Sequence, residues 1–179
     1  MLRTMAPPDD VQQFVEALRG YVARVLGGGV ALDGSPESLA FVDHYVAETA
    51  GAKLDEAVLR LVAPALGAYL GEVTIARFGG RWTLESADPA TWRVDLDPVE
   101  LRFYPVGMAA EALAREEVEG FDAGMQAKPE LMSPLAEALA QSPPVDESYY
   151  YSLTGRYEVL EQAVDILVEL ERQRREDRN

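Results

Sequence analysis

The 179-residue sequence contains no cysteine and only one histidine. The absence of cysteine excludes disulfides, thiolate zinc sites and cysteine nucleophiles. No run of about 18 apolar residues is visible, and residues 1–10 hold no apolar stretch of signal-peptide length. We therefore expect a protein that does not span a membrane, with the cytoplasm as its default location.

Basic residues are scarce, with 16 Lys and Arg against 31 Asp and Glu, a net charge of −15. Such a charge repels phosphate backbones and acidic lipid surfaces, so neither nucleic acid nor a membrane is an expected partner. A basic protein would be steered toward this chain, although net charge also serves solubility alone. Fourteen of the bases are arginine, a bias associated with GC-rich bacterial genomes.

The hydrophobic share of 48% and the charged share of 26% are ordinary for a globular protein. We expect residues 1–179 to form a single domain whose oligomeric state the sequence leaves open. Helical spacing of apolar residues predicts a helix from Pro8 to about Leu26 and another from Ser35. A third, from near Leu54, is apolar on nearly all faces and should be central, and Pro64 predicts a kink or a junction of two helices there.

Period-two alternation then predicts three short strands, with inward positions at Trp82 and Leu84, at Trp92, Val94 and Leu96, and at Leu101 and Phe103. Turns at Asp88-Pro89 and Asp97-Pro98 favour an antiparallel meander. The predicted fold is therefore α+β, with helices packed on one face of a small three-stranded antiparallel meander. The predicted parts are helical 8–78, meander 81–105 and helical 107–175.

The predicted C-terminal part contains a helix from Gly107 to about Glu119 and a loop from Gly120 to Pro129. A short helix follows, from Met132 or Ser133 to Gln141, and the last helix runs from Tyr157 to Arg175. Between these two helices, the tyrosines at 149–151 lie in an extended or turn segment.

Motifs for nucleophilic or nucleotide chemistry are missing from the sequence. There is no G-x-S-x-G elbow, and Gly27-Gly28-Gly29 lacks the Lys-Ser or Lys-Thr pair of a phosphate loop. His44 could share a metal or a proton with Asp43 and Glu48, but a metal needs three or four ligands. No cofactor, metal site or catalytic residue is therefore predicted.

Gly67 and Gly71 are spaced to let another element approach the helix backbone closely, because glycine is otherwise costly inside a helix. Glu72 beside them is either buried and paired with Arg77 or Arg81, or simply solvated.

Residues 109–147 carry nine acids against two bases. Within this stretch, a solvated acidic face is expected. Tyrosine is enriched at binding hot spots, so the tyrosine run either forms a contact surface or packs the last helix onto the sheet. The predicted partner-binding residues are Glu111, Glu116, Glu117, Glu119, Tyr149, Tyr150 and Tyr151.

About 40 residues resemble a pattern found in small bacterial α+β domains of unassigned function. The pattern is Gly67-Ala68-Tyr69-Leu70-Gly71-Glu72, then Gly79-Gly80-Arg81-Trp82, with Phe103-Tyr104-Pro105-Val106-Gly107 at the strand that leads into the next helix. The resemblance implies a fold and carries over no functional residue. Some such domains look like immunity or accessory proteins beside bacterial toxins.

Three functions remain open on the sequence alone. The leading hypothesis is a non-enzymatic protein-interaction protein (adaptor, regulatory or toxin-neutralising) that binds a basic protein partner. The second is a small enzyme using carboxylates, either Glu72 or the Asp43, His44 and Glu48 group. The third is a small-ligand binder with an apolar cavity between sheet and helices, lined by Trp82, Trp92 and Phe103.

Overall fold

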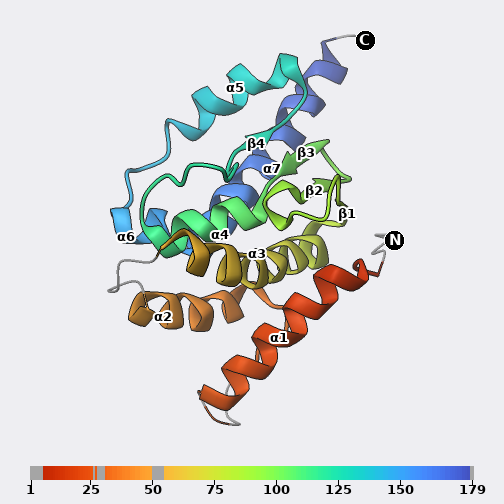
Figure 1. Ribbon diagram of the computed structural model, residues 1–179. Coiled ribbons are helices and arrows are strands. Elements are labelled where there is room, and N and C mark those ends of the chain that lie inside the picture. The colour runs from red at the N-terminus through yellow and green to blue at the C-terminus, as the bar shows by residue number, and fades with distance from the viewer. Residues whose placement is uncertain (1–5, 26, 28–30, 50–54, 178–179) are drawn as a thin grey trace.

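A computed structural model describes residues 6–25, 27, 31–49 and 55–177, and shows an α+β fold (Figure 1). Helix α3 (Glu56–Phe78) crosses the middle of the molecule, with α1 (Asp9–Val25) and α2 (Leu39–Thr49) below it in this view and α4 (Pro105–Ala114) above it. The small sheet lies to the right. The α+β prediction is confirmed.

The two N-terminal helices form for the reasons that the sequence indicates. Helix α1 buries an apolar stripe at Val11, Val15, Leu18 and Val22. The side chain of Ser35 accepts a hydrogen bond from the Ser38 amide and caps a 3-10 turn that leads into α2. Tyr21 of α1 meets Tyr45 of α2 edge to face, with ring centroids 5.1 Å apart.

Helix α3 continues through Pro64 as one element, so of the two expected alternatives, a kink or a junction of two helices, the junction is wrong. Asp55 caps its start by accepting from the Val58 amide at 2.9 Å. Contrary to the sequence expectation, α3 is long and apolar enough to cross a membrane by length and composition. However, 67% of its most apolar window is buried inside the protein, as in a core helix.

The sheet has four strands, in the order β1-β2-β3-β4: β1 (Gly80–Thr83), β2 (Arg93–Leu96), β3 (Leu101–Phe103) and β4 (Met125–Gln126). All three pairings are antiparallel. The prediction of three strands is therefore incomplete, because β4 forms within the expected loop from Gly120 to Pro129. Its Met125 pairs with Phe103.

The two faces of the sheet differ in polarity, as the period of two requires. Trp82, Val94 and Phe103 share the inner face, and the latter two are fully buried. The outer face carries polar side chains: Thr83 donates to Asp95 at 2.6 Å, and Arg93 pairs with Glu85 and Asp95.

The expected close approach at Gly67 and Gly71 is confirmed. A Cβ on Gly67 would lie 2.5 Å from the Val106 Cα atom of α4, and one on Gly71 would lie 2.2 Å from the Trp82 ring. These two glycines therefore bring α4 and strand β1 against the central helix.

Helix α4 ends earlier than predicted, at Ala114. Arg115 adopts the left-handed conformation with a φ of 57°, and its amide bonds to the Glu111 carbonyl. The three acidic residues Glu116, Glu117 and Glu119 consequently follow the helix instead of lying on its face.

The C-terminal elements also differ in their bounds. Helix α5 (Pro129–Leu139) begins before Met132. The expected extended or turn segment is wrong for Tyr149 and Tyr150, which lie in a short helix, α6 (Glu147–Tyr150), whereas Tyr151 lies in the turn after it. The last helix, α7 (Leu153–Glu176), begins four residues before Tyr157. Loop 140–146 descends from α5 to α6 along the left of the molecule (Figure 1).

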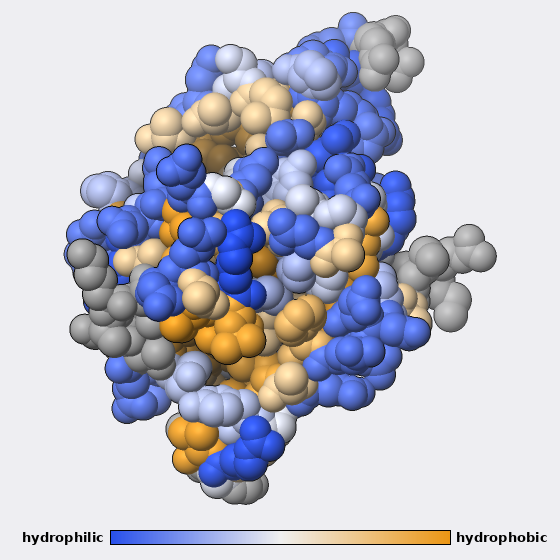
Figure 2. Space-filling view, in the orientation of Figure 1, coloured by the Kyte–Doolittle hydropathy of each residue, from blue (hydrophilic) through white to orange (hydrophobic). Residues whose placement is uncertain are grey.

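Polar side chains cover most of the face in Figure 2, but an apolar band crosses its middle, over α3. Leu61 of α3 is 75% exposed. Beside it in the sequence, Arg60 places its guanidinium 5.4 Å from the centre of the Phe121 ring, which ties α3 to the segment after α4.

Candidate functional site

An apolar groove lies between loop 140–146, α6 and α7, with a volume of about 780 Å³. We call it the tyrosine groove. Three tyrosines, two prolines and three aliphatic side chains dominate its lining. The full set is Leu139, Ser142, Pro143, Pro144, Val145, Glu147, Tyr149, Tyr150, Tyr151, Gly155, Glu158, Val159 and Gln162. Val145 is 56% exposed and Tyr150 46% exposed, so this apolar surface faces solvent.

Close packing of α6 on the first turn of α7 shapes one end of the groove. A Cβ on Gly155 would lie 2.1 Å from the Tyr149 carbonyl oxygen, so only glycine permits this approach. The Ser152 hydroxyl donates to that same carbonyl at 2.7 Å and accepts from the Gly155 amide at 2.9 Å. The tyrosines are therefore held by backbone contacts as well as by their rings.

Arg156 packs against the rings of Tyr150 and Tyr151. Its guanidinium lies 4.3 Å from the centre of the Tyr150 ring and 5.5 Å from that of Tyr151. The same group donates a 2.7 Å hydrogen bond to Glu111 of α4. Arg156 is 8% exposed and Glu111 9% exposed. One buried ion pair thus joins α4 and α7 and supports the aromatic rings of the 150–151 segment.

The charge of the groove comes from two carboxylates, Glu147 and Glu158, because its lining contains no Lys or Arg. Burial, followed by a hydrogen bond with Glu158, raises the pKa of Tyr149 to about 12. An uncharged Tyr149 hydroxyl therefore lies beside the Glu158 carboxylate. The groove presents neutral hydroxyls and negative charge together.

The predicted partner-binding residues fall into separate environments. Glu111 is buried in its ion pair and does not belong to a solvated face, and burial raises the pKa of its carboxyl. Glu116, Glu117 and Glu119 are exposed. Of these three, Glu117 lies close enough to Tyr151 that its charge adds to the effect of burial in raising the tyrosine pKa.

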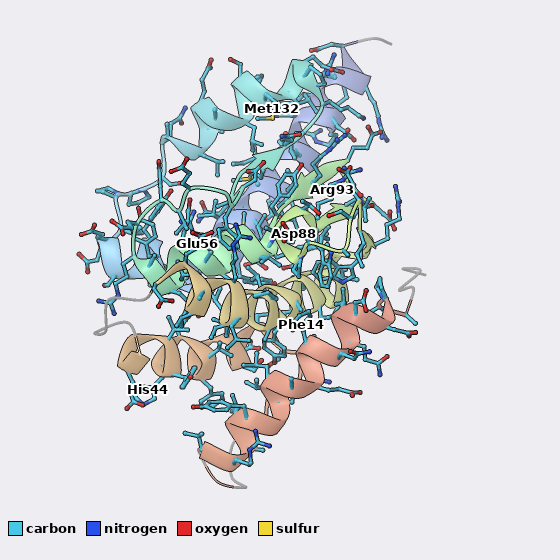
Figure 3. The ribbon with its side chains drawn as sticks, in the orientation of Figure 1. Phe14, His44, Glu56, Asp88, Arg93 and Met132 are labelled. Atoms are coloured by element: carbon cyan, nitrogen blue, oxygen red, sulfur yellow. The ribbon has the colours of Figure 1, made fainter. Side chains whose placement is uncertain are left out.

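Asp43, His44 and Glu48, the group considered for a carboxylate enzyme, do not converge on one site. Asp43 accepts hydrogen bonds from the backbone amides of Leu153 at 2.6 Å and Thr154 at 2.9 Å, so it caps α7. His44 and Glu48 are 3.6 Å apart and both largely exposed. Figure 3 shows His44 at the outer side of α2. Among the residues that the structure describes, no group of three or more His, Asp or Glu is placed to hold a metal ion.

Glu72 is half-buried, but its partner is neither of the predicted arginines. It accepts a 2.7 Å hydrogen bond from the indole nitrogen of Trp82, and burial raises the pKa of its carboxyl. Glu72 also lines a depression of about 330 Å³ with Gln12, Glu16 and Arg19 of α1. The carboxyl group is thus available from one side.

The aromatic residues proposed to line an internal cavity serve packing. Trp92 is buried edge to face against Phe14, with ring centroids 5.8 Å apart, and Phe103 is fully buried. Figure 3 shows Phe14 on α1, directed toward the centre of the molecule. Trp82 fills the space that Gly71 leaves open.

Sequence reasoning missed Arg156, Glu158 and the Pro143-Pro144-Val145 wall. Arg156 carried a usable signal, because a cation in the first turn of a helix opposes the helix dipole and calls for a special partner. The two prolines were interpreted only as a break between helices. Their place opposite α7 follows from the packing of α6 and has no local signature.

Comparison with known proteins gives no relative: no protein-family model, no curated protein and no solved structure matches this chain.

Proposed function

We propose that this chain is a cytoplasmic, non-enzymatic protein-interaction protein that binds a basic protein partner through the tyrosine groove and the acidic segment after α4. Such a surface would suit an adaptor, a regulatory protein or a toxin-neutralising protein. The identity of the partner distinguishes between them.

The observation that carries this proposal is the composition of the groove. Exposed tyrosines on a firm support are typical of binding hot spots, because they bury a large apolar area and lose little entropy. Here the Arg156–Glu111 pair fixes the rings before any partner arrives. The carboxylates of Glu147 and Glu158 add a negative charge without a compensating cation in the lining.

The acidic segment strengthens the match to a basic partner. Glu116 and Glu117 are exposed and follow the left-handed turn at Arg115. With a net charge of −15, the whole chain steers cations toward itself, and the effect falls as salt screens the field.

The test is a pull-down from native lysate with the tagged chain at low and moderate salt. Two variants address the two halves of the surface: the double variant Tyr149→Ala/Tyr150→Ala and the triple variant Glu116→Lys/Glu117→Lys/Glu119→Lys. A control with the same charge change uses exposed acids outside α6 and α7, Asp10, Glu16 and Glu37.

We expect a stoichiometric partner of basic character that both surface variants lose and the charge control retains. A partner that all variants retain places the interface elsewhere. No partner at either salt concentration contradicts the proposal.

A carboxylate enzyme is the second candidate, and Glu72 is the observation that favours it. A half-buried carboxyl of raised pKa beside a depression is the pattern of a general acid. A hydrolase substrate screen against wild type and Glu72→Gln tests this candidate. Turnover that the variant loses supports it, and equal turnover in both proteins removes Glu72 from any chemistry.

A further inference from the structure

Resting on the proposed function, we infer that the part of the partner that fills the tyrosine groove is an extended, proline-containing segment that carries an arginine or lysine. Two observations lead to this occupant: the chemistry of the lining and the sign of its charge.

The walls of the groove touch at one end. The Ser142 hydroxyl of loop 140–146 donates a 3.2 Å hydrogen bond to the Gln162 side chain of α7. This bond joins loop 140–146 to α7 at one point of the groove lining.

The lining suits a backbone that has no internal hydrogen bonds. A polyproline-type segment leaves its carbonyl groups free and docks in grooves lined by aromatic residues, where its preformed shape keeps the entropy loss small. Tyr149, Tyr150 and Tyr151 supply rings and hydroxyls, and Pro143 and Pro144 add a rigid apolar wall. Arg156 holds Tyr150 by one face, so the ring is ordered in advance.

The charge of the groove selects a cation on the incoming segment. Glu147 and Glu158 belong to a lining that contains no Lys or Arg, and Arg156, which lies against the Tyr150 ring, already pairs with Glu111. Glu158 is exposed, so the oxygens of its carboxylate are free to accept from an incoming group. A guanidinium or ammonium group placed there makes a charge-assisted hydrogen bond.

The experiment is selection of a phage-displayed library of random 12-residue peptides on the full chain. The same library is selected on three variants: Tyr150→Ala, Glu158→Gln and, as a control for one removed surface charge, Glu37→Gln. We expect enriched peptides with proline and at least one Arg or Lys. Their affinity, measured by fluorescence anisotropy, falls about tenfold in Glu158→Gln and stays unchanged in Glu37→Gln.

Three results overturn the inference: enriched peptides with helical spacing of apolar residues, enriched acidic peptides, or no enrichment. The pull-down separates these failures from failure of the proposed function. If the pull-down captures a partner through Tyr149 and Tyr150 but the peptide selection fails, only the inference of an extended basic segment is rejected. If the pull-down captures no partner and the peptide selection also fails, the proposed protein-interaction function is rejected as well.

Circular dichroism of each variant guards against trivial loss of binding by unfolding. If Tyr150→Ala unfolds, Tyr150→Phe keeps the ring on Arg156 and removes only the hydroxyl, so the comparison with Glu158→Gln still decides the outcome. Peptides that bind Glu158→Gln as tightly as wild type overturn the predicted cation contact.

Discussion

The guanidinium of Arg156 donates a 2.7 Å hydrogen bond to the carboxylate of Glu111, and both side chains are almost excluded from solvent. The pair is 45 residues apart in the sequence and joins α7 to α4. It keeps a positive charge in the first turn of a helix, where the dipole disfavours one. Its integrity therefore matters for both the fold and the groove above it.

Removing one partner of this pair leaves a buried charge unpaired. We expect Arg156→Met to lower the free energy of unfolding by about 3–5 kcal/mol, measured by urea denaturation. The double variant Glu111→Met/Arg156→Met should recover much of that loss, because no lone charge remains. Equal loss in the single and double variants would mean that packing around Arg156, and not the charge, is what matters.

Asp43 is a cap supplied from another helix. Asp43→Ala leaves the Leu153 and Thr154 amides without their acceptor, and we expect a loss of about 1–2 kcal/mol. Thermal unfolding followed by circular dichroism measures it. Asp43→Asn keeps an oxygen acceptor and should cost less, whereas His44→Ala, next to it but exposed, should change little. Equal effects at the two positions would contradict the capping role.

Gly155 permits the contact between α6 and α7. Gly155→Ala places a methyl group 2.1 Å from the Tyr149 carbonyl oxygen, so α6 must shift away. We expect faster hydrogen exchange at residues 147–151 and a loss of about 1–3 kcal/mol. Gly20→Ala is the matched control, because nothing lies within 4 Å of its added Cβ. Unchanged exchange at 147–151 would show that α6 is not fixed by this contact.

Glu72 gives the stability a recognisable pH dependence. Burial raises the pKa of its carboxyl above the ordinary value of 4.5, so the folded state binds the proton more readily than the unfolded chain. Stability from this group is therefore greatest below pH 4.5 and is lost as the pH rises through the folded pKa.

Glu72→Gln should remove that loss while its amide oxygen still accepts from the Trp82 indole. We expect the variant to gain stability relative to wild type as the pH rises from 4 to 7, measured by urea denaturation across that range. A difference between variant and wild type that does not vary with pH would contradict the shifted pKa.

The sequence predicted correctly those helices and strands that depend on residues close together in the chain. Ser35 as a cap, the buried stripe of α1 and the alternation at Val94 and Leu96 each depend on residues a few positions apart. The left-handed turn at Arg115 was not predicted, because a non-glycine residue seldom takes that conformation and because Glu116 and Glu117 are good helix formers. Strand β4 is two residues long and shows no period, since its position depends on pairing with β3.

The candidate site likewise has a part that the sequence indicates and a part that depends on contacts between distant segments. Composition selected the tyrosines and acids as candidates, and three of those tyrosines, Tyr149, Tyr150 and Tyr151, line one groove. The ion pair that removes Glu111 from the surface and the proline wall opposite α7 both depend on contacts between distant segments. No pattern of spacing within one element encodes them.

The hydrogen bonds of Asp43 to Leu153 and Thr154 close a loop of 110 residues. During synthesis α2 leaves the ribosome long before α7 is made. The Asp43 carboxylate therefore cannot bond to the Leu153 and Thr154 amides until nearly the whole chain has been synthesised. Contacts of such long range slow folding and make it cooperative. The nascent chain is expected to hold α1 to α3 loosely until α7 docks, and a truncation before residue 153 should expose that unfinished core to chaperones and proteases.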